Sequence, residues 1–170
     1  MTLDEIPAGE GVFVDATVFV YHFAGASPAC RRFLDRCEQG ELKAFTSVAA
    51  LAEVSHRLMM MEAVSRGFVS AGNVAKKLRK KPGAVKKLRT YHENVQRIPL
   101  MRVEVKPLDL KTLLNAADLR VEYGLMVNDS LMASTALSTG LQIIATADRD
   151  FQRVQTLSVA LPGDLESHDS

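Results

Sequence analysis

The chain has few of the residues that mark disulfide-rich, zinc-binding or membrane proteins. Among its 170 residues are two cysteines, four histidines and only short apolar runs. Because a bilayer span needs about 20 consecutive apolar residues, no segment is suited to cross a membrane. The first eleven residues contain Asp4, Glu5 and Glu10 and lack the apolar region of a secretory signal. We therefore expect a cytoplasmic protein without membrane contact.

The sparse cysteines and histidines argue against a site built from sulfur or imidazole. Cys30 and Cys37 are seven residues apart on one predicted helix face. This spacing is about two turns, too far for a disulfide within the helix, so we expect buried, reduced thiols. None of the four histidines is spaced like a zinc ligand; they are His22, His56, His92 and His168.

Recognisable cofactor and nucleophile motifs are also missing. No G-x-G-x-x-G or G-K-[S/T] phosphate loop occurs, and no Ser-His-Asp order stands out. Hydrophobic residues make up 47% of the chain, which excludes a disordered or collagen-like class. A chain of this length fits one domain, residues 1–170, that buries roughly two-thirds of its unfolded surface.

Short strands and helices alternate along the apolar pattern. The predicted strands are residues 11–14, 43–46, 101–105, 141–145 and 157–161. The predicted helices include residues 17–22, 28–39, 110–123 and 129–138, and a long helix after Ser47 with the apolar face Leu51, Val54, Leu58 and Met61. Ser27 and Ser47 are suited to cap helices, and Gly40, Gly124 and Gly140 to end them. The alternation predicts a parallel sheet covered on both sides.

The segment from about residue 70 to 97 has a different character. It reads as a helical hairpin interrupted at Pro82-Gly83, with short apolar stripes and a basic outer face. The core of the domain is then expected at about residues 11–161, followed by a polar, mobile tail at 164–170.

Eight basic residues without an acidic neighbour occupy the middle of this hairpin. They are Lys76, Lys77, Arg79, Lys80, Lys81, Lys86, Lys87 and Arg89. The other 13 basic residues stand against 20 acidic ones, so the rest of the chain carries about −7. The functional interpretation is an arm beside the active site that binds nucleic-acid phosphates; the alternative is a solvated helix surface. Tyr91 is the one nearby aromatic, so base stacking is not indicated.

Four carboxylates stand where apolar segments meet turns or helices: Asp15, Glu53, Asp129 and Asp148. Asp15 and Asp148 each follow a predicted strand. In a parallel α/β sheet both should project into the crevice beyond the carboxyl ends of the strands. Asp129 begins a helix and Glu53 lies in the second turn of another, and helices that return antiparallel to the strands start at the same edge. We therefore expect one shared acidic site.

Each carboxylate also has an ordinary structural explanation. Asp15 can cap the turn at Thr17, and Asn128 and Asp129 can be N-cap and first-turn residues. Asp148 and Asp150 can form an Asx-turn, and Glu53 can lie on an exposed helix stripe. The coincidence of all four favours the shared site.

Four clustered carboxylates repel one another unless a proton or a cation is bound. A hard divalent cation such as Mg²⁺ (or Mn²⁺) binds carboxylate oxygens and needs no histidine or thiolate. It lowers the pKa of bound water and neutralises charge on a phosphodiester, which fits hydrolysis of that bond. Thr17 and Thr146 are placed to orient carboxylates or water by hydrogen bonds, and local capping is an equally good explanation of each.

The whole pattern resembles a PIN domain, in particular the VapC-type toxin ribonucleases. The matching pieces are residues 13–19, the helix carrying Glu53, residues 124–133 and residues 146–151. The resemblance spans about residues 11–161. It implies a three-layer α/β/α PIN-like (Rossmann-like) fold with a five-stranded parallel sheet and a magnesium- or manganese-dependent endoribonuclease acting on single-stranded RNA.

By position, the resemblance assigns metal binding and catalysis to Asp15, Glu53, Asp129 and Asp148, with Thr17 and Asp150 in support. It also implies a homodimer held inactive by a small antitoxin protein. The segment at 70–97 is longer and more basic than in the shortest toxins of this type. The alternatives are an antitoxin-free RNA-processing or DNA flap PIN nuclease and an inactive RNA-binding scaffold.

Overall fold

The structure, a computed structural model, describes residues 1–165. His168 and most of the predicted tail lie outside the described residues. Asp164, placed in that tail by the sequence pattern, is held against the start of a helix: its carboxylate accepts hydrogen bonds from Ser27 Oγ at 2.7 Å and the Ala29 N–H at 2.8 Å. Asp164 therefore belongs to the folded domain.

Five parallel strands form one sheet in the order β3-β2-β1-β4-β5. Their bounds are β1 Gly11–Val14, β2 Lys43–Ser47, β3 Val103–Lys106, β4 Ile143–Ala145 and β5 Ser158–Ala160. β1 is the central strand, and Val12, Phe13 and Val14 are fully buried because helices cover both faces. The chain moves one way from β1 to β3 and the other way from β4 to β5. The switch point therefore lies between β1 and β4.

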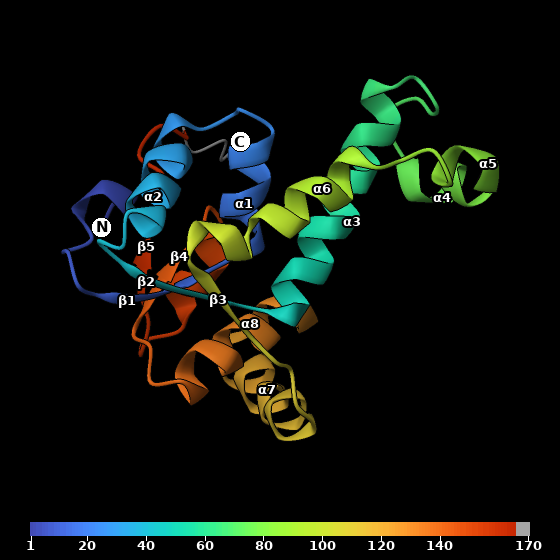
Figure 1. The fold of residues 1–170 in the computed structure, drawn as a ribbon. Coiled ribbons are helices and arrows are strands. Elements are labelled where there is room, and N and C mark those ends of the chain that lie inside the picture. The colour runs from blue at the N-terminus through green and yellow to red at the C-terminus, as the bar shows by residue number, and fades with distance from the viewer. Residues whose placement is uncertain (166–170) are drawn as a thin grey trace.

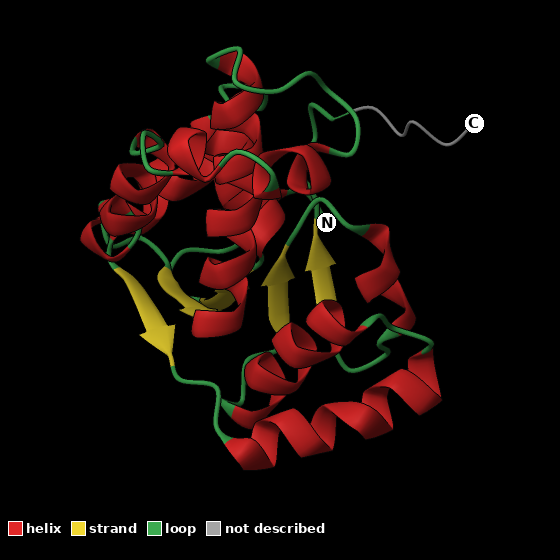
Figure 2. Cartoon of the chain, turned by 90° about the vertical axis from the view of Figure 1, so that its right-hand side faces the viewer, coloured by secondary structure: helices red, strands yellow, loops and turns green. Residues whose placement is uncertain are grey.

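Helices lie on both sides of the strands (Figures 1 and 2). The larger helices are α1 Ala16–Phe23, α2 Pro28–Glu38, α3 Val48–Ser65, α6 Thr90–Arg97, α7 Leu110–Tyr123 and α8 Val127–Ser138. Figure 1 shows α1 and α2 on one side of the sheet, and α7 and α8 on the other. Three 3-10 turns complete the described chain: η1 Leu3–Glu5, η2 Pro99–Met101 and η3 Arg149–Arg153. The predicted three-layer α/β/α fold is confirmed.

The caps of the helices follow the sequence closely. Ser27 Oγ accepts the Cys30 N–H at 3.0 Å, and Ser47 Oγ accepts the Ala50 N–H at 3.1 Å. Gly124 ends α7 in the left-handed region at φ 67°, where a residue without Cβ fits best. Cys30 and Cys37 are buried free thiols, as expected, and burial raises their pKa values to about 11 and 12.

Two features of α3 differ from its predicted apolar face. Met61 is 41% exposed, whereas Glu62, the next residue, is buried. The Glu62 carboxylate accepts the backbone N–H groups of Arg89 at 3.0 Å and Tyr91 at 2.9 Å, and Arg66 lies within 3.3 Å. These hydrogen bonds satisfy donors at the start of α6, and together they lower the pKa of Glu62 against the opposing effect of burial. A buried carboxylate thus holds the following segment in place.

The middle of the chain is three short helices rather than the predicted two-helix hairpin. α4 Val74–Arg79 and α5 Pro82–Val85 precede α6. Pro82 begins α5 instead of separating two helices, because proline at the first helical position loses no hydrogen bond. Val69, Leu78 and Leu88 pack with Ala63 of α3 in a second, small hydrophobic cluster. The segment is therefore packed onto the end of α3.

β1 has the predicted bounds, and the boundaries of the other four strands differ from the predicted ones by at most two residues. Residues 99–101 form η2, so β3 starts at Val103 and not at Met101. Pro99 at the start of this turn favours the tight helical conformation over a strand. Among residues 1–165, none of the helices combines the length and hydropathy that a membrane span requires.

Candidate active site

Asp15 lies at the switch point between the two central strands. It follows β1 directly, and its N–H donates to the Ala145 carbonyl of β4 at 2.9 Å. Its side chain, 2% exposed, caps α1 by accepting the Thr17 N–H at 3.3 Å, as one of the two predicted roles requires. Burial raises the pKa of Asp15, although the hydrogen bonds from Thr17 and Thr146 oppose this. Capping and a place in the site are therefore compatible.

Two threonines join Asp15 to the loop that carries Asp148. Asp15 Oδ2 accepts hydrogen bonds from the Thr17 hydroxyl and, at 2.7 Å, from the Thr146 hydroxyl. Thr17 Oγ1 in turn accepts the Ala147 N–H at 2.9 Å, and Thr146 Oγ1 accepts the Asp148 N–H at 2.9 Å. These contacts fix the end of β1 against the end of β4. Thr17 and Thr146, predicted as supporting residues, thus connect Asp15 to the loop after β4.

Asp148 caps the η3 turn that follows β4. Its Oδ1 accepts the Asp150 N–H at 2.8 Å, which is the Asx-turn considered from the sequence. Asp150 itself is turned to Arg153, whose guanidinium lies 2.8 Å from Asp150 Oδ1. Asp150 therefore lies at the margin of the site with a partner of its own.

Glu53 comes to the same edge from the second turn of α3. Its Oε2 accepts a hydrogen bond from Asn128 Nδ2 at 3.3 Å, and Arg57 lies 3.7 Å from Oε1. Burial raises the pKa of Glu53, as do the charges of Asp15 and, less strongly, Asp148; Arg57 and Asn128 oppose them. Glu53 is partly buried, so the exposed stripe considered from the sequence is not its setting.

Asp129 is the carboxylate most affected by the others. It lies in the first turn of α8, while the N-cap is Met126 and neither Asn128 nor Asp129. Burial raises its pKa to about 6, with further contributions from the charges of Asp148, Asp15, Glu53 and Asp150. A carboxylate feels four other carboxylates only when they lie close by. The structure thus brings together the four residues predicted from the sequence.

The donor set fits a hard divalent cation. Four carboxylates, which follow β1 and β4 or lie on α3 and α8, offer oxygen ligands, and the charges of their neighbours help to raise the pKa values of Glu53 and Asp129. Within residues 1–165, however, no three His, Cys, Asp or Glu side chains are already gathered tightly enough to hold a metal ion. Carboxylates that repel one another settle apart, and a cation reverses that repulsion. Binding therefore requires the side chains to close in.

The eight basic residues do not lie beside these carboxylates, contrary to the expected arm at the active site. They belong to α4, α5 and the turns around them, at the far end of α3 in Figure 1. Among the described residues none of them forms an ion pair. The small cluster on α3 fixes the position of these helices.

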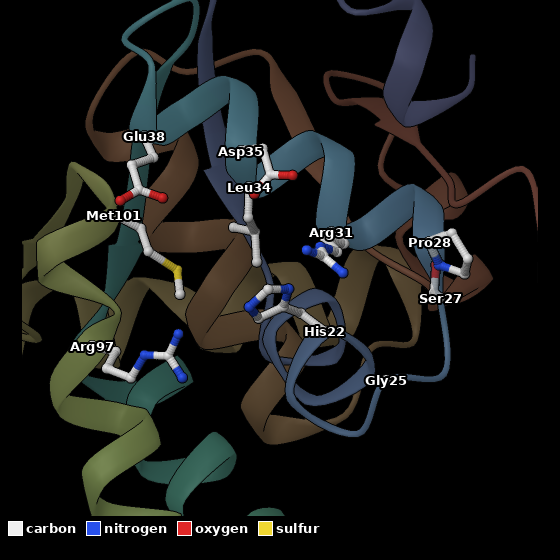
Figure 3. Close-up of a pocket in the computed structure, with 10 residues that line it drawn as sticks. All are labelled: His22, Gly25, Ser27, Pro28, Arg31, Leu34, Asp35, Glu38, Arg97 and Met101. Atoms are coloured by element: carbon white, nitrogen blue, oxygen red, sulfur yellow. The ribbon is translucent and has the colours of Figure 1, made fainter.

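A separate cavity of about 400 Å³ lies between α1, α2 and α6 (Figure 3). His22, Arg31 and Arg97 line it, together with Asp35 and Glu38. Burial and the Arg97 guanidinium lower the pKa of His22. None of the predicted site residues lines this cavity, so it is distinct from the four carboxylates.

Sequence analysis missed Arg57 and the contact that Asn128 makes with Glu53. Arg57 stands four residues after Glu53, and that spacing on a helix was a usable signal for a charge pair. Asn128 was read as a helix cap because it precedes Asp129. The Asn128 amide reaches Glu53 only because α8 packs against α3, which the sequence does not reveal.

A five-stranded parallel sheet with carboxylates converging at its switch point defines an α/β domain with an acidic site. The chain belongs to the PIN domain family, whose sequence pattern it matches over residues 12–157. PIN domains are nuclease domains that generally use divalent metal ions. No curated protein is significantly similar to the chain in sequence.

Several solved structures share the fold. The VapBC2 complex of Rickettsia felis bound to a fragment of its promoter DNA matches with a TM-score of 0.58 at 18% identity, over 89% of this chain and 98% of the other. A toxin–antitoxin complex from Klebsiella pneumoniae matches with a TM-score of 0.54 and 18% identity, over 91% of this chain and 99% of the other. VapC20 of Mycobacterium tuberculosis, a toxin that cleaves the sarcin–ricin loop, matches with a TM-score of 0.51 and 15% identity. The match covers 84% of this chain and 94% of the other. The expected resemblance to VapC toxins is thereby confirmed for the fold.

Proposed function

We propose that this protein is a divalent-metal-dependent endoribonuclease that hydrolyses single-stranded RNA and is the toxin of a toxin–antitoxin pair. The observation that carries the proposal is a set of hydrogen bonds at the switch point: Thr146 joins Asp15 to the backbone of Asp148, and Asn128, next to Asp129, donates to Glu53. The raised pKa values of Glu53 and Asp129 agree with four carboxylates near one another. Membership in a nuclease family and the fold shared with VapC toxins support it.

In this proposal Asp15, Glu53 and Asp129 hold the principal cation, and Asp148 completes the site or holds a second one. Bound Mg²⁺ or Mn²⁺ supplies a more acidic water and neutralises charge that builds on the phosphodiester. Thr17 and Thr146 keep Asp15 in one orientation by donating to the same oxygen, Oδ2. Asn128 orients Glu53 in the same way. The protein thus presents oriented carboxylate oxygens before substrate arrives.

A nuclease assay tests this function. The protein is incubated with single-stranded RNA and single-stranded DNA of the same sequence, in EDTA, in Mg²⁺ and in Mn²⁺. We expect internal cleavage of the RNA only when a cation is present, because the repelling carboxylates need it to act. Cleavage in EDTA would contradict the metal assignment, and exclusive cleavage of DNA would contradict the substrate.

Two alternatives give different results. An antitoxin-free processing or flap nuclease cleaves nucleic acid but leaves a host growing when it is expressed, whereas a toxin arrests growth. An inactive scaffold binds RNA and cleaves nothing with either cation. The acidic set argues against the scaffold, since negative charge beside phosphates gives a binding protein no advantage. Four of the solved structures that share the fold come from VapBC, FitAcB or other toxin–antitoxin proteins, which favours an antitoxin partner here.

The expected homodimer has a suitable surface on α7. This helix packs chiefly against α8, and Ala116 is its one buried residue. Leu110, Leu114 and Val121, which are 69%, 62% and 89% exposed, fall on one outer stripe at helical spacing. An apolar stripe left open on a helix indicates a partner surface. We assign it to a second copy of the chain.

Charges beside the stripe suit an antiparallel pair of α7 helices. One flank of the stripe on α7 carries three charged residues. Lys111 is near the start of the helix, and Asp118 and Glu122 are near its end. A two-fold axis that makes the helices antiparallel brings these flanks side by side and reversed. Lys111 of each copy then faces the acidic end of the other.

Replacing Leu114 and Val121 together by glutamate should convert the dimer to a monomer. The change buries two charges at the stripe if the copies associate, and it leaves the domain core intact because both side chains are exposed. Analytical ultracentrifugation of the free protein measures the outcome. The control carries glutamate at Leu100, which is 76% exposed on η2. A wild type that is monomeric alone and associates only with its antitoxin would assign the stripe to that partner.

A further inference from the structure

The basic segment, residues 76–89, stands on a rigid support. Lys77 Nζ donates to Ser70 Oγ at 2.8 Å, and Lys81 Nζ donates to the Phe68 carbonyl at 2.8 Å. Arg66 donates to the Lys87 carbonyl, and Glu62 holds the backbone at Arg89. The backbone of the segment is therefore tied to α3 at several points, and the helices that carry its charges have defined positions relative to α3.

The same face of α3 leads from the acidic site to this segment. Glu53, Arg57, Met60 and Val64 follow one another at intervals of three and four residues, so they share one side of the helix. Met60 and Val64 pack against the small cluster that carries α4 and α5. At 1.5 Å per residue, Met60 is about 10 Å and Val64 about 16 Å from Glu53 along the axis. Figure 1 shows α4 and α5 at that far end.

Within residues 1–165, the charges on the segment have no acidic partner. Seven of its eight basic side chains are exposed, all but Lys77, and none is in an ion pair with any residue of 1–165. Exposed cations without acidic partners, gathered in fourteen residues, are the electrostatic footprint of a polyanion-binding surface. The aromatic side chains Phe68 and Tyr91 are partly buried against the small cluster, so contacts to phosphates dominate over base stacking.

We propose that this segment is an exosite that binds the RNA strand several nucleotides away from the bond that is cut. α3 sets the separation: about 10–16 Å corresponds to roughly three to five nucleotides at about 3.4 Å each. Substrates that reach from the carboxylates to α4 and α5 gain affinity, and shorter ones do not. The inference rests on the proposed function for its substrate, and it adds a dependence on substrate length.

Binding in EDTA tests the exosite independently of cleavage. Fluorescence anisotropy compares a 2-nucleotide with a 20-nucleotide single-stranded RNA, for the wild type and for Lys80→Gln/Lys86→Gln. Both lysines are exposed, and among residues 1–165 their side chains make no hydrogen bond, so the variant should fold. The matched control is Lys43→Gln/Arg31→Gln, which removes two exposed charges elsewhere.

We expect the wild type and the control to bind the long RNA at least tenfold more tightly than the short one, and the Lys80/Lys86 variant to lose most of this advantage. The dependence of log Kd on log salt should fall by about 1.4 in that variant, because each lost single-strand phosphate contact removes about 0.7. Equal losses in the variant and the control would overturn the exosite. So would a loss confined to duplex DNA, which would make the segment a DNA contact.

This binding experiment and the nuclease assay, run with the same proteins and RNAs, together separate this inference from the proposed function. If the long RNA binds as expected while no cation supports cleavage, the exosite stands and the nuclease proposal fails. If RNA is cleaved but its length and the two lysines have no effect on Kd or on the ratio of kcat/KM between long and short substrates, the exosite fails alone.

Discussion

Changing Asp15 to asparagine should abolish cation-dependent RNA cleavage while the protein remains folded. Even residues that only orient a metal ligand typically change activity by about 10–100-fold, so loss of a proposed ligand should cost about a hundredfold or more. Asp15 holds the central position, since its carboxylate lies between the ends of β1 and β4 and raises the pKa of both Glu53 and Asp129. Initial cleavage rates at saturating Mg²⁺ give the measurement.

The fold of this variant should be as stable as that of the wild type or more so. The asparagine oxygen can accept the hydrogen bonds from Thr17 and Thr146 that Asp15 Oδ2 accepts. Losing one negative charge also relieves repulsion among the carboxylates. The thermal midpoint in EDTA should therefore stay level or rise. Asp35→Asn, an exposed carboxylate on α2, is the control and should keep full activity. Undiminished cleavage by Asp15→Asn would remove Asp15 from the site.

Much of the fold was predictable because the strands are short, apolar and punctuated by caps. The apolar run from Val12 to Val14 predicted a buried strand. Ser27 and Ser47 predicted the starts of the two helices that they cap. Asp15 and Asp148 could be placed because residues after parallel strands meet at one edge. These inferences use local pattern and a general rule of topology, and they need no knowledge of distant contacts.

The features that were missed depend on contacts between elements. Glu62 lies on a face of α3 that also carries polar residues, so the sequence gives no sign that it is buried. Its carboxylate has two N–H donors only because the start of α6 packs against α3. The position of the basic segment likewise follows from the small cluster of Ala63, Val69, Leu78 and Leu88. A charge run in the sequence indicates a ligand class, and the packing decides how far from the active site that ligand is bound.

Without a cation, the protein should lose stability as the pH rises from about 4 to about 6. Asp129 has a folded-state pKa raised from 3.8 to about 6, so between these values the folded state binds more protons than the unfolded state. The free energy of unfolding then falls with rising pH, and the loss is complete above the folded pKa. The raised pKa values of Asp15 and Glu53 act in the same direction. The lowered pKa values of Glu62, Asp109 and Asp164 oppose the loss near the lower end of this window, and the lowered pKa of His22 opposes it near the upper end.

Mg²⁺ should reverse this loss, and most strongly where Asp129 is ionised. A ligand at a hundredfold excess over its Kd adds about 2.7 kcal/mol, which is about 5–11 °C in thermal midpoint for a domain of this size. We expect that shift at pH 7.5 and little of it at pH 4.5, where protons compete for the same oxygens. Thermal unfolding in EDTA and in Mg²⁺ across this range measures it.

The comparison that isolates the site is the wild type against Asp129→Asn. The variant lacks the titrating group, so its midpoint in EDTA should depend less on pH between 4 and 6, and Mg²⁺ should stabilise it less at pH 7.5. Taking the difference between the two proteins removes contributions from carboxylates outside the site, which both proteins share, and leaves those of Asp129 and the carboxylates that interact with it. If the difference in thermal midpoint between the wild type and Asp129→Asn does not change with pH, and Mg²⁺ stabilises both proteins equally, the cation binds elsewhere. The four carboxylates would then owe their grouping to the turns and helix starts that they cap.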